Sequence, residues 1–461
     1  MIKKINSIFF IVVILGASLL FLTLPKKEKS YTEKRKLAEI PEFNYFNYVK
    51  GIWAQKIDDY IDDHFPFRKN IIDIADVVQS LKGVHLEKQE KIFVAKLPKK
   101  EKKVLDSDKN HTKMNYLDDF EQSYSGSMLI INGCVYPMGG GSPLMSKSFS
   151  KMVSEYAREL KGETRVITAV APLSSAFIPV KKYYKYNKQN KLTLEAIGKH
   201  LTDGAIFGDV FKEMNVHAGE KMYFGTDHHW KPIGAYYAYV AFCKAVGFEP
   251  VSLTKMEKRV KYNFIGTLYN HTRDLSVKES PDTMEYYVPK VNTTAVQYPK
   301  AGFKHPMRSH VFYHNASGGN TYSTFIAGDH PLMKISTDVK NGKKALVIKN
   351  SYGNAFVVYL ISHYEEVWVI DFRYSQHNIF QLIRENKIND MIFGLGMYGA
   401  MSGQAINMMR NLGKQSGEFT QEKETIKETF KEIDTVKKYK NIKPINENKE
   451  YESLDPALIL N

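Results

Sequence analysis

Two short segments carry residues whose types and spacing could do chemistry together. In GTDHHW, Asp227 lies two positions before His229, and in KNSYGNAF, Ser351 comes shortly after an apolar run. Residues two apart in an extended segment project to the same side, so Asp227 is expected to orient the His229 imidazole. An imidazole held in this way can take a proton from a serine hydroxyl, and the carboxylate then supports its positive charge. The two segments together predict a Ser-His-Asp site for acyl chemistry that needs no cofactor.

Ser351 is expected on a rigid turn between a buried strand and a helix. Free N–H groups at the start of that helix would point toward an oxyanion formed by acyl attack. Gly353 would let the backbone approach the reacting group closely, and the Asn354 amide would offer a further donor. Serine also caps helices well, so a purely structural role is the alternative for Ser351 taken alone.

The remaining residues of GTDHHW allow other interpretations. His228 should point elsewhere, and Trp230 should line the pocket or stack on a sugar ring. The segment could instead form a local hydrogen-bonded turn before a helix, or bind a metal ion. A metal site would need more ligands, and the other histidines considered show no recognisable ligand spacing: His217, His271, His310, His314 and His330. We therefore expect no metal.

The elements that must position these residues indicate an α/β fold, a parallel sheet with flanking helices. Residues 345–348 and 367–370 are apolar runs typical of buried parallel strands, and a helix between them extends to Ser362. INDMIFGLGMYG offers one more strand. Because open α/β sheets hold their sites at the carboxyl ends of strands, Ser351 is well placed for a functional role.

Other residues near the same strand ends are candidates for substrate binding. Asp371 would end the second strand, and Arg373 follows it closely enough to bind an acidic sugar. The alternative for Arg373 is a surface salt bridge with a nearby carboxylate. Tyr352 would either line an acceptor groove or pack in the core.

The order of composition along the chain suggests four regions. Residues 1–29 are a membrane anchor or signal segment, and residues 30–114 form a helical stalk and a lysine-rich loop. The main α/β domain covers 115–414, with a β-rich insertion near 248–326 that lacks helical period. Residues 415–461 are charged and are expected to hold a docking helix and a flexible end.

The first region has the features of an uncleaved, single-pass membrane anchor. Lys3 and Lys4 precede an apolar run from Ile5 to Leu24, about the length that spans a bilayer as a helix. No small-residue cleavage site is evident. The expected location is therefore the cell membrane, with the bulk of the protein extracytoplasmic.

Composition narrows the class of partner. The formal net charge is +15, which outside the cytoplasm suits anionic lipids, wall polymers or acidic glycans better than nucleic acid. A merely soluble, lysine-rich surface is the alternative. Cys134 and Cys243 are too few for a disulfide scaffold, although one disulfide between them stays open.

Three segments carry a family resemblance: DDYIDDHFPFRKN, GTDHHWKPIGAYYAY and KNSYGNAFVVYLISHYEEVWVIDFRY. With the apolar start, they resemble the DHHW family of Gram-positive bacteria, which is related to the SGNH-like alginate O-acetylation proteins. The resemblance covers most of residues 31–399 and implies an SGNH hydrolase-like fold, with the sheet of flavodoxin-like type. Asn350 stands before the serine, where family members often carry an acidic residue.

The resemblance also implies roles for residues and a class of substrate. Ser351 would be the nucleophile, His229 the general base and then acid, and Asp227 its orienting group. The chain would be an O-acetyltransferase or acetylesterase that adds or removes acetyl groups on a cell-surface polysaccharide. Related systems pair such a protein with a multi-pass membrane O-acyltransferase.

Two other classes of function remain open at this point. The chain could be a non-catalytic glycan-binding or assembly protein of an exopolysaccharide system, using a basic and aromatic surface. It could also be a metal-dependent hydrolase centred on Asp227, His228 and His229.

Overall fold

A computed structural model describes residues 2–30, 35–68, 70–71, 74–75, 78, 91–94, 127–139, 141–298 and 306–415. The chain separates into two units, Met1–Glu418 and Phe419–Asn461, and the second unit lies outside the described residues. The docking helix expected after residue 415 and nearly all of the lysine-rich loop also fall outside them.

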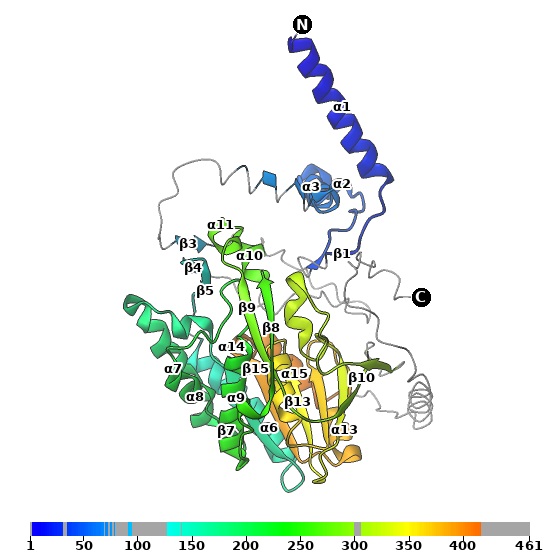
Figure 1. Ribbon diagram of the computed structural model, residues 1–461. Coiled ribbons are helices and arrows are strands. Elements are labelled where there is room, and N and C mark those ends of the chain that lie inside the picture. Colours follow the sequence, from blue (N-terminus) through cyan, green and yellow to red (C-terminus); the bar gives the residue numbers. More distant parts are fainter. Residues whose placement is uncertain are drawn as a thin grey trace, which may run out of the picture. The chain divides into compact units, whose positions relative to one another are not determined.

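The central sheet has eight strands (Figure 1). They are β6 Arg165–Ala171, β7 Ile206–Gly208, β10 Thr293–Tyr298, β11 Met307–Ser309, β12 Leu332–Thr337, β13 Lys344–Lys349, β14 Glu366–Asp371 and β15 Asp390–Gly396. Their order is β11-β10-β12-β14-β13-β15-β6-β7. The five strands from β14 to β7 are parallel, whereas β12, β10 and β11 add on as antiparallel neighbours. The α/β class is confirmed, but the sheet is mixed rather than parallel throughout.

The antiparallel edge comes largely from the segment expected as a β-rich insertion. Residues 248–326 supply β10 and β11 to the main sheet, where Ala295, Val296 and Tyr298 of β10 are buried. Within the described part of this segment, β8 Glu257–Phe264 and β9 Asp282–Val288 pair as a separate two-stranded sheet. The helices α10 Thr267–Thr272 and α11 Leu275–Lys278 lie between these two strands in sequence. Part of the insertion therefore extends the core.

Helices pack on both faces of the sheet. Phe356 of α12 Gly353–Leu360 meets Phe242 of α9 Pro232–Val246, and both share one apolar cluster with Ile392 of β15. The next residue of β15, Phe393, packs instead against Phe149 of α6 Pro143–Glu159. Successive residues of a strand face opposite sides, so a sheet covered on both faces needs the continuous apolar runs seen in the sequence.

The remaining helices complete the two layers and the edge near β7. They are α7 Tyr184–His200, α8 Val210–Val216, α13 Ile379–Asn386, α14 Met397–Met401 and α15 Gly403–Leu412, with 3-10 turns η1 Ser174–Phe177, η2 Lys181–Tyr183, η3 Leu253–Lys255 and η4 Gly318–Thr324. Helix α9 ends at Gly247, and that glycine has the left-handed φ of 78° that a helix end of this kind requires.

The amino-terminal part holds short elements. They are α1 Ile2–Thr23, β1 Lys29–Ser30, β2 Arg35–Lys36, α2 Tyr45–Val49, α3 Ile52–His64, and β3 Lys91–Val94, which pairs with the hairpin β4 Ser127–Ile131 and β5 Cys134–Pro137. Helix α3 ends just before Pro66. Among the residues that the structure describes, no helix combines the length and apolar character that crossing a membrane requires. The anchor in residues 1–29 stays a prediction. Cys134 and Cys243 are both free thiols.

Candidate active site

The segment GTDHHW forms a tight loop rather than an extended strand. Tyr223 and Trp230 pair across it as an antiparallel bridge, and Lys231 N–H donates to Met222 O at 2.7 Å. Inside the loop, His229 N–H donates to Asp227 Oδ1 at 3.1 Å. The local hydrogen-bonded turn and the Asp-His pairing, set out above as alternatives, are therefore both present, and a turn rather than strand alternation joins the two side chains.

Asp282, at the start of β9, holds this loop in place. Its carboxylate accepts hydrogen bonds from Gly225 N–H at 2.8 Å, Thr226 N–H at 2.8 Å and Thr226 Oγ1 at 2.8 Å. Lys221 and Lys231 each lie 3.7 Å from Asp282 Oδ1. The carboxylate is fully buried, so the loop depends on Asp282 as the acceptor for these donors. Asp282 had no signal in the sequence, because it lies 55 positions after Asp227 (282 minus 227).

Asp282→Asn is expected to lower the free energy of unfolding by about 2–3 kcal/mol, because an amide N–H₂ would then face backbone donors in a buried site. Urea denaturation of the variant checks this. Asp338→Asn is the matched control, since Asp338 also accepts two hydrogen bonds but does so at the exposed surface. Equal losses in the two variants would show that the Asp282 carboxylate does not anchor the loop.

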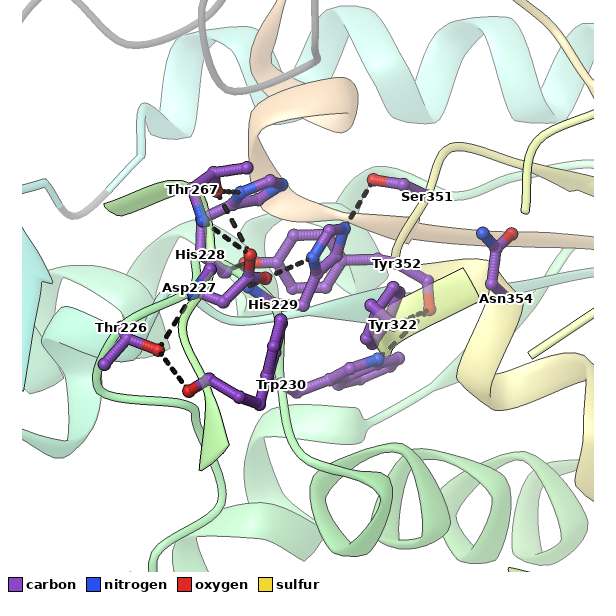
Figure 2. A network of polar contacts seen from close by, with 12 residues as sticks. Thr226, Asp227, His228, His229, Trp230, Thr267, Tyr322, Ser351, Tyr352 and Asn354 are labelled. Atoms are coloured by element: carbon purple, nitrogen blue, oxygen red, sulfur yellow. Dashed lines mark hydrogen bonds and ion pairs between the residues drawn. The ribbon is translucent and has the colours of Figure 1, made fainter. Parts of the chain in front are cut away.

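A continuous chain of hydrogen bonds joins Asp227, His229 and Ser351 (Figure 2). His229 Nδ1 lies 2.6 Å from Asp227 Oδ1, and His229 Nε2 lies 2.7 Å from Ser351 Oγ. All three residues are at most 6% exposed. The structure thus brings together the three residues chosen from the sequence, at distances suited to proton transfer between Ser351 and His229.

The second oxygen of Asp227 is held by α10. Thr267 N–H donates to Asp227 Oδ2 at 2.9 Å, and Thr267 Oγ1 donates to the same oxygen at 3.2 Å. His228 Nδ1 lies 2.6 Å from Thr267 Oγ1, so Thr267 links His228 to Asp227. The backbone at Gly266 lies very close to the Asp227 side chain. A Cβ at Gly266 would lie 2.2 Å from Asp227 Cβ, so only glycine fits. No motif in the sequence pointed to Thr267.

Ser351 lies on the expected turn between a buried strand and a helix. Strand β13 ends at Lys349 and α12 begins at Gly353. A Cβ on Gly353 would lie 2.4 Å from Lys349 Cβ and 2.7 Å from Gly394 O, so the helix can start this close to the sheet only with glycine. The glycine serves backbone packing, as the sequence suggested, though against the protein's own strands.

The backbone N–H groups of this turn differ in their partners. Gly353 N–H donates to Asn350 O at 2.9 Å, and Asn354 N–H donates to Ser351 O at 3.1 Å. Within the described residues, no backbone carbonyl accepts from the N–H of Ser351 or of Tyr352. At this turn, the N–H groups of Ser351 and Tyr352 are therefore the ones that no described backbone carbonyl occupies.

Asn354 and Arg373 belong to a buried ion-pair cluster beside the turn. Asn354 Nδ2 donates to Asp329 Oδ1 at 2.9 Å, and Arg373 bonds both Asp329 Oδ2 at 3.0 Å and Asp371 Oδ2 at 2.6 Å. Lys349 Nζ lies 2.6 Å from Asp329 and 3.0 Å from Asp371. The predicted salt bridge of Arg373 is present, but it is buried rather than on the surface.

This cluster determines the ionisation of Asp329. Burial by itself would raise the pKa of the Asp329 carboxyl, but the charges of Lys349 and Arg373, with hydrogen bonds from Lys349 and Asn354, hold that pKa well below its usual range. The same burial, with the charge of Lys349, lowers the pKa of His330. The carboxylates of the cluster thus neutralise two cations close to the end of β13.

Aromatic side chains enclose the histidine. Tyr322 of η4 stacks on His229, with ring centroids 3.9 Å apart and planes at 10° (Figure 2). Trp230 Nε1 donates to Tyr352 O at 3.0 Å, and the Tyr352 hydroxyl donates to His228 O. Trp230 and Tyr352 are 1% and 4% exposed, so both pack within the wall and leave little ring face for a sugar. Tyr322 had no signal in the sequence.

A metal site at GTDHHW has some support from proximity alone. One ligand atom from each of Asp227, His228 and His229 lies within 4.8 Å of the other two, and no further such residue joins the group in the described part of the chain. Both ring nitrogens of His229 are already bonded, to Asp227 and to Ser351. A cation held here would have to displace one of these contacts, so this donor set fits proton transfer better than metal binding.

The fold and the site define an α/β protein with a buried Asp-His-Ser chain of hydrogen bonds at the carboxyl end of a central strand. The family model described as DHHW protein matches residues 121–370, which is more than half of the 461 residues. The chain belongs to the DHHW family. The resemblance seen in the sequence is confirmed, and nothing among the curated proteins matches.

Solved structures agree on the fold. A DHHW family protein from Eubacterium siraeum DSM 15702 is 30% identical, with a TM-score of 0.57 over 62% of this chain and 94% of that one. Bacillus cereus PatB1, solved with a sulfonyl adduct, is 18% identical, with a TM-score of 0.50 over 61% and 96%. The O-acetyltransferase domain of Pseudomonas putida AlgJ is 13% identical over 62% and 96%, with a TM-score of 0.30, a likeness too weak to support an inference.

Proposed function

We propose that this protein is a serine-dependent O-acetyltransferase or acetylesterase that acts on a cell-surface polysaccharide. The observation that carries the proposal is the hydrogen-bonded chain from Asp227 through His229 to Ser351. A buried serine in contact with a histidine, which is itself oriented by a carboxylate, is the arrangement that makes a hydroxyl nucleophilic at neutral pH. Membership of the DHHW family is consistent with it.

The proposed reaction has two half-reactions that use the same histidine. Ser351 Oγ attacks the carbonyl carbon of an acetyl ester while His229 Nε2 accepts the hydroxyl proton, and Asp227 balances the imidazolium charge through Nδ1. The tetrahedral intermediate expels the donor's alkoxide, which takes the proton from His229 and leaves acetyl-Ser351. Water or a sugar hydroxyl then attacks this ester and loses its proton to His229, and the second tetrahedral intermediate expels Ser351 Oγ, which takes that proton back. Water gives hydrolysis, and a sugar hydroxyl gives transfer.

We assign the oxyanion of this intermediate to the N–H groups of Ser351 and Tyr352. Both precede α12, and no described backbone carbonyl accepts from them. Donors already aimed at the developing charge, next to the positive end of a helix, stabilise it without rearrangement during the reaction. Gly353 supports them by keeping the turn close to Lys349 and Gly394.

The envelope setting is part of the proposal. The apolar run from Ile5 to Leu24, preceded by Lys3 and Lys4, would anchor the protein in the cell membrane by one span, with its catalytic domain extracytoplasmic. The net charge of +15 suits an acidic polysaccharide or lipid surface. A multi-pass membrane O-acyltransferase is the proposed partner that would supply acetyl groups from the cytosolic side.

Covalent labelling tests the catalytic proposal. A sulfonyl fluoride or an activated acetyl ester should add one group to Ser351, seen by intact mass and located by peptide mapping. Ser351→Ala should not react, whereas Ser375→Ala, which removes another buried serine, should react like the parent protein. If no adduct forms on Ser351 while polysaccharide binding persists, the alternative holds: a non-catalytic glycan-binding or assembly protein.

A further inference from the structure

We infer that Tyr322 is a positioning residue for His229, and that the face of its ring stabilises the imidazolium that forms when Ser351 is deprotonated. The inference rests on the proposed function for its role in the reaction, although its physical basis can be measured without turnover. Tyr322 comes from η4, within the segment 248–326 that was expected to form a β-rich insertion.

The contact between the two rings is close and parallel. The centroids of Tyr322 and His229 are 3.9 Å apart and the planes differ by 10°, so the phenol covers one face of the imidazole. The centre of an aromatic face is electron-rich, and a cation against it is attracted most strongly where water is excluded. Tyr322 is 3% exposed and His229 is 2% exposed, so this condition is met.

The Tyr322 ring is itself fixed by its surroundings. Its hydroxyl donates to Tyr352 O at 3.4 Å, the carbonyl that also accepts from Trp230 Nε1. Edge-on contacts with Phe325 at 5.5 Å and Phe224 at 6.4 Å hold the ring plane. Because the Tyr322 ring is fixed, it restricts rotation of the stacked His229 imidazole. This restriction keeps Nε2 of His229 directed at Ser351.

Other groups face His229 from the neighbouring elements. Asp227 bonds Nδ1, Ser351 bonds Nε2, and the His228 ring lies at 3.9 Å with a tilt of 36°. Two rings cannot share one face at that distance, so His228 covers the face opposite Tyr322. The Tyr352 ring lies further away, at 5.3 Å. The negative charge of Asp227 acts in the plane of the His229 imidazole. The Tyr322 ring instead stabilises the protonated imidazole from one of its faces.

The experiment compares Tyr322→Leu with Tyr322→Phe, which keeps the aromatic face and loses only the long hydroxyl contact. The His229 pKa is measured by NMR titration in a Ser351→Ala background. Removing the face favours the neutral imidazole, so Tyr322→Leu should lower this pKa by about one unit while Tyr322→Phe leaves it nearly unchanged. In the active protein, kcat/KM should fall about tenfold in Tyr322→Leu alone. In the same variant, the acid limb of the pH profile of kcat/KM should move to lower pH.

A graded series keeps the test independent of folding. Replacing Tyr322 by phenylalanine, 4-fluorophenylalanine and 3,4,5-trifluorophenylalanine preserves shape and weakens the negative face stepwise, so the His229 pKa should fall in that order. A pKa that is constant across the series, or equal losses of kcat/KM in Tyr322→Leu and Tyr322→Phe, would overturn the inference. A stepwise pKa shift without any acyl turnover would instead contradict the proposed function and leave the ring contact established.

Discussion

Replacing His229 by alanine is expected to lower kcat for acetyl release from a chromogenic acetyl ester by on the order of 10⁵–10⁶-fold. His229 Nε2 is the described base within hydrogen-bond distance of Ser351 Oγ, at 2.7 Å, and without it the buried hydroxyl keeps its proton. Asp227 cannot substitute, because its contact with the nucleophile runs through His229. Steady-state kinetics at saturating ester measure this effect.

The neighbouring histidine provides the matched control. His228 has the same side chain and is also buried, but its Nδ1 bonds Thr267 and not Ser351. His228→Ala should therefore reduce kcat by no more than about tenfold, through a looser Asp227. If the two alanine variants lost activity to the same extent, the base would not be His229 alone. Turnover that survives His229→Ala would exclude the proposed mechanism.

The strand, turn and helix that position Ser351 were accessible to sequence analysis because their signals are local. Residues 345–348 are apolar without alternation, which a strand covered on both faces requires, and the helix start is marked by Gly353. The pairing of Asp227 with His229 was also predicted, since the two residues are neighbours in sequence. Its geometry was not, because an aspartate that accepts from the N–H two residues later forms a turn instead of a strand.

The residues that hold the site in place could not be predicted from the sequence in the same way. Thr267, Asp282 and Tyr322 contact the GTDHHW loop from 40 to 93 positions away (267 minus 227, 322 minus 229), and each is an ordinary residue in its own segment. The antiparallel pairing of β10 with β12 is likewise a long-range contact without periodic sequence signal. Tertiary packing decides such positions, and a single sequence holds no local trace of it.

Asn354 and Arg373 show a different limit of sequence analysis. Both lie where a strand end meets the candidate site, and both have donors suited to binding an oxyanion or an acidic sugar. In the structure, Asp329 and Asp371 accept those donors instead. Position on the sheet was predicted, but the partner of a buried polar group depends on which opposite charge is also buried nearby.

Lys349→Met is expected to lower the free energy of unfolding by about 3–5 kcal/mol, because it removes a buried cation from the fully buried Asp371 carboxylate and the partly exposed Asp329 carboxylate. Lys349 is fully buried at the end of β13, with Nζ 2.6 Å from Asp329 and 3.0 Å from Asp371. Lys344→Met is the control on the same strand, since Lys344 pairs with Glu366 at a partly exposed site and should cost at most about 1 kcal/mol. Urea denaturation at pH 7 compares the two.

The pH dependence of this loss separates charge from packing. The pKa of Asp329 is depressed by burial-strengthened contacts with Lys349 and Arg373, so its contribution to stability is present above the ordinary value of 3.8 and is lost as pH falls through the folded-state pKa. The difference between the parent protein and Lys349→Met should therefore be largest above about pH 4 and shrink on further acidification. A difference that stays constant down to acid pH would assign the loss to the missing methylene packing, and the charge balance beside Ser351 would then contribute nothing to holding the turn.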